Sequence, residues 1–536
     1  MSAPTSSADA PSAQPGGMAR AAFLIALGNI VSRVLGLARE TVIANLFGAT
    51  GLVSAFRVAQ IIPTMLYDLL VGGMVSSALV PVFSEQAEKS RAGLWHVASL
   101  LLSLTVIVLA GVVLILELAA EPVAFLLAGG FSPDLLAVTA RLIRLTTPAV
   151  LFLSLSGVLT GLLYALNRFA LPAFTAAAFN AVIVVTALVG VVGFNRGIET
   201  LAVGLLLGAL GQVLLQLPGL RDARLRFVLD LHHPVLRRIG RLYLPIILGL
   251  VISQVAIALD RNFASRTGEQ SIAWMQYATT IIQFPLGLVS AAISLAILPT
   301  LSRQASAGSD GLASFMDTLT AGLRMVLVLI IPATVALFIL AHPVVALLFQ
   351  HGDFTAFDTR QTALALRFYL LGLTFAAIDQ PLIFAYYARQ NTLTPALVGL
   401  LGVAFYLTAA LLPTLFRPMQ MTDLVLANSV QLTGHALVML WLVNRLASLR
   451  GRGLAVTLFK AGLASAGMGL WLVGLTRLLA PLFLAGHLLS EVALVGLLSA
   501  TGAAVYFLLL WLLRAGELQL LFALGGRIAS RLKSAG

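Results

Sequence analysis

The chain carries, at residues 32–40, the sequence Ser32-Arg33-Val34-Leu35-Gly36-Leu37-Ala38-Arg39-Glu40. This stretch lies in the middle of the first apolar segment, which begins near Met18 and is long enough to cross a bilayer as a helix, a span that takes about 20 residues. A charge at the bilayer centre costs roughly 3 kcal/mol on insertion scales, so such charges pair with one another or face a water-filled cavity. The stretch therefore predicts a membrane protein that handles a polar, anionic cargo inside the membrane.

The composition is that of a membrane protein. Of its 536 residues 60% are hydrophobic and only 10% are charged, with a mean hydropathy of +1.00, whereas a soluble domain has about 25% charged residues. The chain has no cysteine, which excludes disulfides and thiolate metal sites. Its seven histidines lack the spacing of metal ligands, and no phosphate-binding loop of the Walker type occurs. We therefore expect no cofactor, no metal site and no ATP hydrolysis.

Apolar runs of about 20 residues or more recur along the chain and predict an all-α polytopic protein with fourteen transmembrane helices. The predicted helices cover residues 20–47, 51–84, 92–118, 135–166, 169–194, 199–220, 234–263, 272–302, 312–340, 358–388, 392–413, 423–446, 454–478 and 488–513. With both termini in the cytoplasm, this count places 19 Lys and Arg residues on the cytoplasmic side and 6 on the other, as the positive-inside rule requires. The net charge of +12 is thus a topology signal, and we expect no nucleic-acid partner.

An internal repeat, offset by about 220 residues, organises these helices. Ala120-Glu121-Pro122-Val123 parallels Ala341-His342-Pro343-Val344, and Arg144 parallels Arg367. Each repeat has six helices, an even number, which predicts two parallel bundles with a cavity between them near the membrane midplane. The predicted parts are a disordered N-terminal tail (1–17), an N-terminal six-helix bundle (18–220), a basic cytoplasmic linker (221–241), a C-terminal six-helix bundle (242–450), helices 13 and 14 (451–514) and a cytoplasmic amphipathic tail (515–536).

Charged residues within the predicted helices are the candidates for a binding site. Those expected to line a cationic, phosphate-binding cavity are Arg33, Arg39, Glu40, Arg57, Arg144 and Arg367. Helical spacing places Arg33 and Glu40 on one face, Arg39 on another, and Arg57 on the same face as Asp68, which would neutralise it. Structural ion pairing and snorkelling to the interface remain alternatives, and snorkelling is the expectation for Arg141, Arg324 and Lys460 near helix ends. Bundle packing and cavity lining both fit Arg144 and Arg367. Asp260-Arg261 occupies the repeat position of Arg39-Glu40.

Several stretches resemble the MurJ (MviN) family of lipid II flippases, which belongs to the multidrug/oligosaccharidyl-lipid/polysaccharide exporter superfamily. The stretches, in order over residues 20–400, are Ser32 to Gly36 with Arg39, Leu46 to Ala49, Asn167 to Phe169 with Pro172 to Phe174, Gln216 to Pro218, and Phe349 to Gly352 with Phe354 to Asp358, where the family has a Q-x-G-x-F-x-x-x-D loop. The sequence departs from the family at Ser54, Tyr67-Asp68, Val71-Gly72-Gly73 and Thr279-Thr280, which replace usual charged residues. It is therefore identified as a divergent member.

The resemblance implies a flippase in the bacterial plasma membrane that carries lipid II, or a similar polyprenyl-pyrophosphate glycan, from the cytoplasmic to the outer leaflet by alternating access. It implies that Arg33 and Arg39 bind the pyrophosphate, that the lipid tail follows helices 13 and 14, and that the protein is not an enzyme. Membrane lipids are further expected partners, and we expect a monomer. A coupling cation is a further candidate partner, with Asp260 as its candidate site. The alternatives are a flippase for another polyprenyl-linked glycan, a small-molecule exporter, a membrane glycosyltransferase, and a degenerate, non-transporting paralogue.

Overall fold

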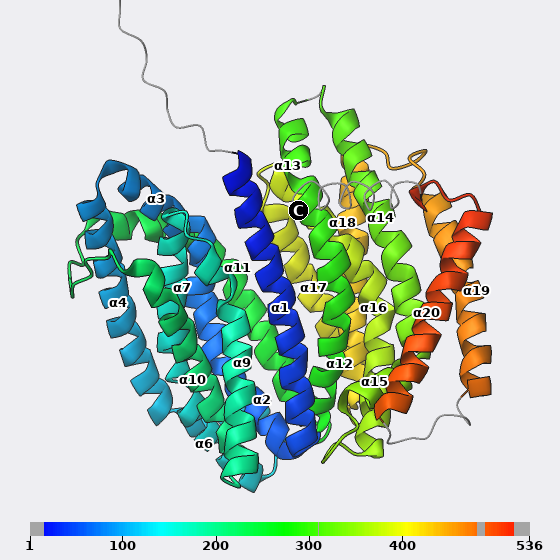
Figure 1. The fold of residues 1–536 in the computed structure, drawn as a ribbon, viewed down its shortest axis with the longest axis horizontal. Coiled ribbons are helices and arrows are strands. Elements are labelled where there is room, and N and C mark those ends of the chain that lie inside the picture. The colour runs from blue at the N-terminus through cyan, green and yellow to red at the C-terminus, as the bar shows by residue number, and fades with distance from the viewer. Residues whose placement is uncertain (1–14, 309, 480–487, 519–536) are drawn as a thin grey trace, which may run out of the picture. The chain divides into compact units, whose positions relative to one another are not determined.

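The structure, a computed structural model, describes residues 15–308, 310–479 and 488–518. These residues form helices joined by short connections, and no strand occurs among them, which confirms the all-α fold class (Figure 1). The predicted disordered tail (1–17) lies outside the described residues except for residues 15–17, which begin the first helix. The predicted amphipathic tail (515–536) lies outside them beyond Leu518.

The chain divides into two compact units, each described here by itself. Unit 1 comprises Met1–Val42, Ala55–Leu126 and Pro133–Val255, and unit 2 comprises Ile43–Ser54, Leu127–Ser132 and Ala256–Gly536. The division falls inside helix α11 (Pro234–Ser265), which bends by 58° between Leu244 and Gly249, on either side of Pro245. The bundle boundaries inferred from the sequence stay predictions.

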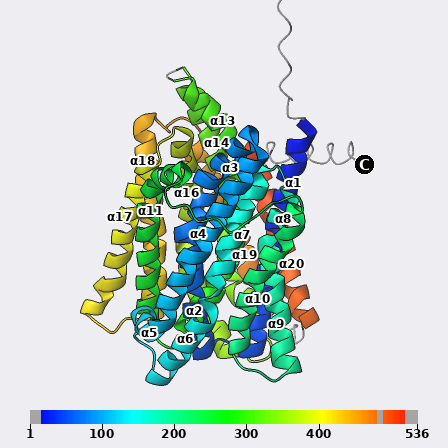
Figure 2. The ribbon, with the colours of Figure 1, turned by 90° about the vertical axis from the view of Figure 1, so that its left-hand side faces the viewer.

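Unit 1 is built from helices of the first half of the chain. They are α1 (Pro15–Phe47, ending in unit 2), α2 (Gly51–Tyr67, beginning in unit 2), the π-helices η1 (Asp68–Gly72) and η2 (Val75–Leu79), α3 (Val80–Lys89), α4 (Arg91–Leu118), α5 (Ala120–Ala128, ending in unit 2), α6 (Pro133–Thr146), α7 (Ala149–Ala165), α8 (Ala170–Ala173), α9 (Thr175–Leu188), η3 (Val189–Gly193), α10 (Glu199–Gln216), η4 (Leu217–Leu220) and the first part of α11. Its core includes Leu79, Phe83, Leu94 and Leu162, which are fully buried between α3, α4 and α7. Helices α9 and α10 run side by side (Figure 2) and approach closely at Gly208, where a Cβ atom would lie 3.0 Å from the Phe179 carbonyl oxygen.

Unit 2 contains the helices of the second half. They are α12 (Ser271–Pro285), the π-helix η5 (Leu286–Ala291), α13 (Ala292–Ser306), α14 (Leu312–Ile339), α15 (Ala341–Phe349), α16 (Ala356–Ala388), α17 (Leu393–Leu411), η6 (Leu412–Leu415), α18 (Met421–Leu446), α19 (Leu454–Leu479) and α20 (Leu488–Leu512). Helices α19 and α20 pack against each other and against α14 (Figure 1). Leu472, Leu498 and Tyr506 form the centre of this contact, and the Tyr506 hydroxyl donates a hydrogen bond of 2.7 Å to the Val328 carbonyl.

Each of the fourteen predicted ranges coincides with a described helix or a run of consecutive helices. Twelve of the described helices, or up to thirteen if the bent α11 is one span, are long and apolar enough to cross a membrane. Helix α1 is not in that set, so the structure supports a multi-pass membrane protein while the count of fourteen spans stays a prediction.

The two halves of the chain share a sequence of elements that fits the internal repeat. Helices α4 and α14 are both 28 residues long, and each is followed by a nine-residue helix, α5 or α15. These short helices begin at the matching segments Ala120-Glu121-Pro122 and Ala341-His342-Pro343. A π-helix also interrupts the second helix of each half, at η1 and η2 in the first and at η5 in the second.

Candidate functional site

Three charged side chains of the first two helices form one network in unit 1. Glu40 of α1 is 1% exposed and Arg57 of α2 is 4% exposed, and a guanidinium nitrogen of Arg57 donates to Glu40 Oε2. Arg39 Nη2 donates to the other oxygen, Glu40 Oε1, at 2.8 Å. One carboxylate therefore bridges two arginines inside the membrane domain, and because an isolated buried charge is unstable, each member depends on the others.

Neutral amides complete this network. Arg39 Nη1 donates a 3.0 Å hydrogen bond to Asn180 Oδ1 on α9, and Arg57 Nη1 donates to Gln60 Oε1 at 3.2 Å. Asn180 is itself held in place, since its Nδ2 donates to the Ser32 carbonyl of α1 at 3.2 Å. Asn180 is not among the site residues predicted from the sequence. Its only signal is a single amide in the apolar segment Ala176-Ala177-Ala178-Phe179-Asn180-Ala181-Val182, and a pairing across 141 residues is not visible in such a pattern.

The network carries a net positive charge, because two guanidinium groups share one carboxylate. Arg39 is 16% exposed and its Nε has no hydrogen-bond acceptor among the described residues. Arg33 lies two turns earlier on α1 and is half-buried. Arg39 thus presents guanidinium donors beside the buried Glu40–Arg57 ion pair. Such donors are suited to bind a phosphate group.

Helical spacing places Arg39 and Glu40 on different faces of α1, and the long Arg39 side chain nevertheless reaches around the helix to bind that carboxylate. One expectation about this cluster is wrong. Asp68 was predicted to neutralise Arg57, but the carboxylate that binds Arg57 is Glu40, and Asp68 is exposed in π-helix η1.

Arg144 and Arg367 occupy equivalent places in the two halves and make equivalent contacts. Arg144 Nε donates to the Glu117 carbonyl near the end of α4 at 3.3 Å, and Arg367 Nε donates to the Phe338 carbonyl near the end of α14 at the same distance. Arg144 also binds Glu121 on α5 at 3.2 Å. Both arginines therefore bind the last carbonyls of a neighbouring helix, where a cation is favourable, and these contacts favour bundle packing over cavity lining.

Asp260 belongs to a separate polar group in unit 2. Its Oδ1 accepts a 2.7 Å hydrogen bond from the Tyr406 hydroxyl of α17, and its neighbour Arg261 donates to Gln276 Oε1 of α12 at 3.4 Å. In the described part of the chain no three His, Asp or Glu side chains gather in a way that could hold a metal ion. Asp260 as an ion-coupling residue stays a prediction.

The arginines and the lysine near helix ends bind protein groups. Arg324 Nε donates a 2.8 Å hydrogen bond to the carboxylate of Glu517, a side chain that is 4% exposed. The same Nε lies 3.0 Å from Thr457 Oγ1. Lys460 Nζ donates to the Arg514 carbonyl at 2.9 Å, and Arg141 lies 3.7 Å from Glu199. The contacts of Arg324 and Lys460 fix α14, α19 and the end of α20 to one another, whereas Arg141 makes an exposed contact between α6 and α10. Snorkelling of these three residues stays a prediction.

The Q-x-G-x-F-x-x-x-D loop has a structural role in unit 2. Asp358 caps α16, because its Oδ2 accepts a 2.9 Å hydrogen bond from the Thr355 backbone amide. Its Oδ1 accepts a second hydrogen bond, also 2.9 Å long, from the Trp274 indole. Gly352 has a φ of +59°, and a Cβ atom there would lie 2.2 Å from the Asn45 carbonyl oxygen. Phe354 is buried edge-on against Tyr277. The motif thus closes a turn, and its residues are satisfied by protein contacts.

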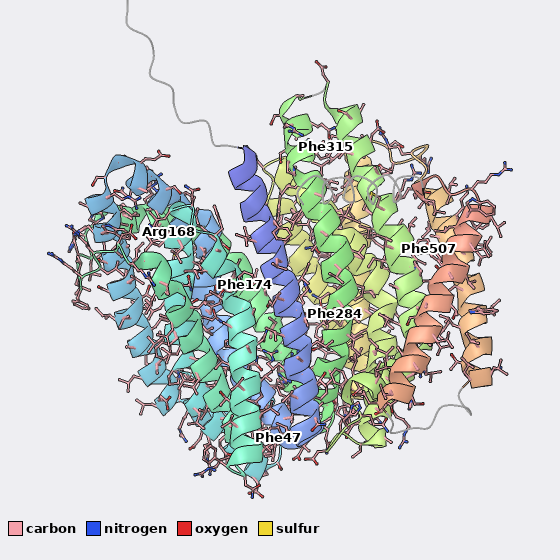
Figure 3. The ribbon with its side chains drawn as sticks, viewed as in Figure 1. Phe47, Arg168, Phe174, Phe284, Phe315 and Phe507 are labelled. Atoms are coloured by element: carbon pink, nitrogen blue, oxygen red, sulfur yellow. The ribbon has the colours of Figure 1, made fainter. Side chains whose placement is uncertain are left out.

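A pocket of about 710 Å³ lies at the connection between α7 and α8, where Figure 3 labels Arg168. Arg168 donates to both carboxylate oxygens of Asp222, at 2.6 and 3.0 Å, and this hydrogen bonding holds the pKa of Asp222 below its ordinary value. Asp222 is 46% exposed, so the pair is a surface contact that orients the connection after α7.

Comparison with known proteins places the chain in a family. The sequence model described as lipid II flippase MurJ matches residues 43–494, which is most of the chain. The chain belongs to the MurJ family of lipid II flippases. Among its relatives, a probable lipid II flippase MurJ of Vibrio cholerae is 33% identical over 402 residues, covering 72% of this chain and 75% of the relative. The lipid II flippase MurJ of Burkholderia cenocepacia is 31% identical over 396 residues, covering 71% and 75%.

Solved structures show the same fold. A lipid II flippase MurJ in an inward closed conformation matches with a TM-score of 0.77 at 22% identity, over 93% of this chain and all of that one. An inward-facing multidrug resistance transporter of the MATE family, in the MOP superfamily, matches with a TM-score of 0.65 at 15% identity, over 78% and 96%. The family identified from sequence motifs is thus confirmed, and with it the polytopic helical fold.

Proposed function

We propose that this protein moves lipid II, the lipid-linked peptidoglycan precursor, from the cytoplasmic to the outer leaflet of the bacterial plasma membrane. The relatives that carry this activity in their names cover most of the chain. The observation in the molecule itself that supports the proposal is the buried Arg39–Glu40–Arg57 network. Both termini are cytoplasmic in this proposal, as the distribution of Lys and Arg favours.

The network suits a pyrophosphate because Arg39 presents guanidinium donors beside a carboxylate that it shares with Arg57. Arg33, on the same helix, is a second candidate donor of the proposed site. A pyrophosphate that reaches Arg39 finds a pre-oriented guanidinium, so little rotamer entropy is lost on binding. Arg144 and Arg367 are left out of the proposed site because their donors bind helix-end carbonyls.

The proposed cycle is alternating access, in which the site opens to one leaflet and then to the other. The lipid tail stays in the membrane beside α19 and α20, whose exposed side chains include Leu470, Leu489 and Trp511. A monomer is sufficient for this cycle, and a cation that couples it to an ion gradient is a further partner of the proposal. Transport of this kind performs no covalent chemistry.

Complementation of cells depleted of their own lipid II flippase tests the proposal. The wild-type chain and Arg144→Ala should restore growth, whereas Arg39→Ala should not, with membrane levels checked by immunoblot. Arg39→Lys, which keeps the charge but not the forked geometry, should restore growth partially. Failure of the wild-type chain at a normal membrane level would contradict lipid II as the substrate and leave a different polyprenyl-linked glycan, or a non-transporting role, in its place.

A further inference from the structure

Unit 2 contains a second buried titratable pair, on helices that the proposed lipid site does not use. His435 of α18 lies 2.9 Å, through its Nδ1, from the Asp379 carboxylate of α16, and both side chains are 13% exposed. The imidazole also lies against α17, since a Cβ atom at Gly402 would lie 3.7 Å from His435 Cδ2. The pair therefore lies where three helices, α16, α17 and α18, meet.

The geometry of this pair suits it to bind a proton. His435 Nδ1 lies 2.9 Å from Asp379 Oδ1, so it either donates to an ionised carboxylate or accepts from a protonated one. A carboxylate next to an imidazole stabilises the imidazolium, and histidine is the side chain that takes up a proton near neutral pH. We propose that Asp379 and His435 form a proton-binding site, and that its occupancy is coupled to the conformational cycle of this transporter.

The position of Asp379 in α16 supplies the link to conformation. Pro381 lies inside this helix and cannot donate to the Ala377 carbonyl, which accepts instead a 2.6 Å hydrogen bond from Ser290 of π-helix η5. Asp379 therefore stands in the turn of α16 whose backbone ladder is interrupted, where helices bend. On the N-terminal side of that turn, the Ser429 hydroxyl of α18 donates a 2.6 Å hydrogen bond to the Phe368 carbonyl and so fixes α18 to α16.

A change of bend at this turn moves Asp379 relative to His435. An imidazolium separated from its carboxylate inside a membrane is unstable, so separation releases the proton, and formation of the pair takes one up. By linkage, a proton supplied from one side of the membrane then favours the arrangement of α16 and α18 in which the pair is closed. The proton is the only ligand that this site needs.

Among the described residues, the ionisable side chain that hydrogen-bonds the imidazole is Asp379. The remaining titratable side chains on the helices packed around the pair are Asp358, Arg360, Arg367, Tyr369, Tyr386 and Tyr387 on α16, Tyr406 on α17, Asp423 and Arg445 on α18, Asp317 and Arg324 on α14, Arg303 on α13, Tyr277 on α12 and His342 on α15.

The first test measures proton binding without any substrate. The full chain, with ¹³C- and ¹⁵N-labelled histidine, is titrated by NMR in lipid nanodiscs, and His435→Gln identifies the His435 signal among the seven histidines. We expect a doubly protonated ring, or a ring hydrogen-bonded to a carboxylic acid, at neutral pH, and loss of that signal in Asp379→Asn. A singly protonated ring that Asp379→Asn leaves unchanged would overturn the proposal.

The second test measures coupling and rests on the proposed flippase function. In proteoliposomes, the flipping rate of lipid II by the wild-type chain should respond to a transmembrane pH gradient, and the responses of His435→Gln and Asp379→Asn should be lost. His342→Gln, which removes an exposed histidine of the same unit, is the matched control and should respond like the wild type. A full gradient response in both pair variants would overturn the coupling. If the wild type flips no lipid at all, the proposed function fails, while the NMR titration still decides whether the pair holds a proton.

Discussion

The repeat places two polar clusters at matching positions, one in each unit, and their charges are arranged in opposite order. In unit 1, Arg39-Glu40 of α1 meets Arg57 of α2 and Asn180 of α9. In unit 2, the corresponding pair is Asp260-Arg261 of α11, with Gln276 of α12 in the place of Arg57 and Tyr406 of α17 in the role of Asn180. The same scaffold thus holds acid and base in exchanged positions.

This exchange changes what each cluster attracts. In unit 1 a carboxylate is bound by two arginines, so the group keeps a positive charge. In unit 2 a carboxylate is satisfied by a neutral tyrosine, and Arg261 meets a neutral amide, so the group has no net charge. The two clusters therefore differ in net charge, and in the proposed function it is the unit 1 cluster that binds the anion.

The largest effect should come from removing the carboxylate that bridges the unit 1 cluster. Glu40→Ala leaves two guanidinium groups without their shared partner, and breaking a buried ion pair in this way costs about 3–5 kcal/mol in the free energy of unfolding. Thermal unfolding of the purified protein in detergent measures this loss. Glu121→Ala, which removes a carboxylate that is 75% exposed, is the control and should cost less than about 1 kcal/mol. Equal losses in both variants would mean that the cluster does not stabilise unit 1.

A smaller effect is expected from the neutral partners, one in each unit. Asn180→Ala and Tyr406→Phe each remove a hydrogen bond to a charged group, which is worth about 1.5–3 kcal/mol of stability. The two losses should be similar in unfolding experiments, but only Asn180→Ala should also weaken binding of lipid II, because it releases Arg39. Tyr387→Phe is the matched control for the hydroxyl deletion. A loss of lipid II binding in Tyr406→Phe equal to that in Asn180→Ala would contradict the asymmetry between the units.

The smallest effect concerns the exposed Arg168–Asp222 pair, a reference for a salt bridge outside the membrane. The pKa of Asp222 is lowered in the folded protein, so its contribution is complete above the ordinary carboxyl value of about 3.9 and is lost as the pH falls through the lower folded value. Because the carboxylate is 46% exposed, that contribution should stay below about 1 kcal/mol. Unfolding of wild type and Arg168→Ala, compared at neutral pH and at a series of lower pH values, should show a difference that is full at neutral pH and decreases as the pH falls below about 3.9. A difference that persists unchanged in acid would assign the effect to packing of Arg168.

Much of the fold was accessible from the sequence because apolar length is a strong signal. The predicted ranges 92–118 and 454–478 differ from α4 and α19 by one residue at an end, since charged or glycine-rich connections bound them. The π-helices η1, η2 and η5 were not predicted, because an i→i+5 hydrogen-bond pattern leaves no mark in hydropathy. The short helices α5 and α15 fall between the predicted helix ranges, although their sequences carry the clearest match of the internal repeat.

The candidate site was predicted in its residues but not in its pairings. Burial of a charge within a helix identified Arg39, Glu40 and Arg57. Their connections depend on tertiary distance, which is why Asn180, 141 residues away, was missed and Asp68 was assigned as a partner of Arg57. Periodicity gives the direction of a Cβ atom, whereas the reach of an arginine side chain decides which carboxylate it binds.

The central claim is that the unit 1 cluster binds the pyrophosphate of the transported lipid, and transbilayer movement of labelled lipid II in proteoliposomes tests it most directly. Wild type and Arg144→Ala should flip the lipid at similar rates. Arg39→Ala should be slower by about tenfold to a hundredfold, the factor that corresponds to losing one hydrogen-bonded charged contact. If Arg39→Ala flips lipid II at the wild-type rate, the cluster is structural and the claim is contradicted.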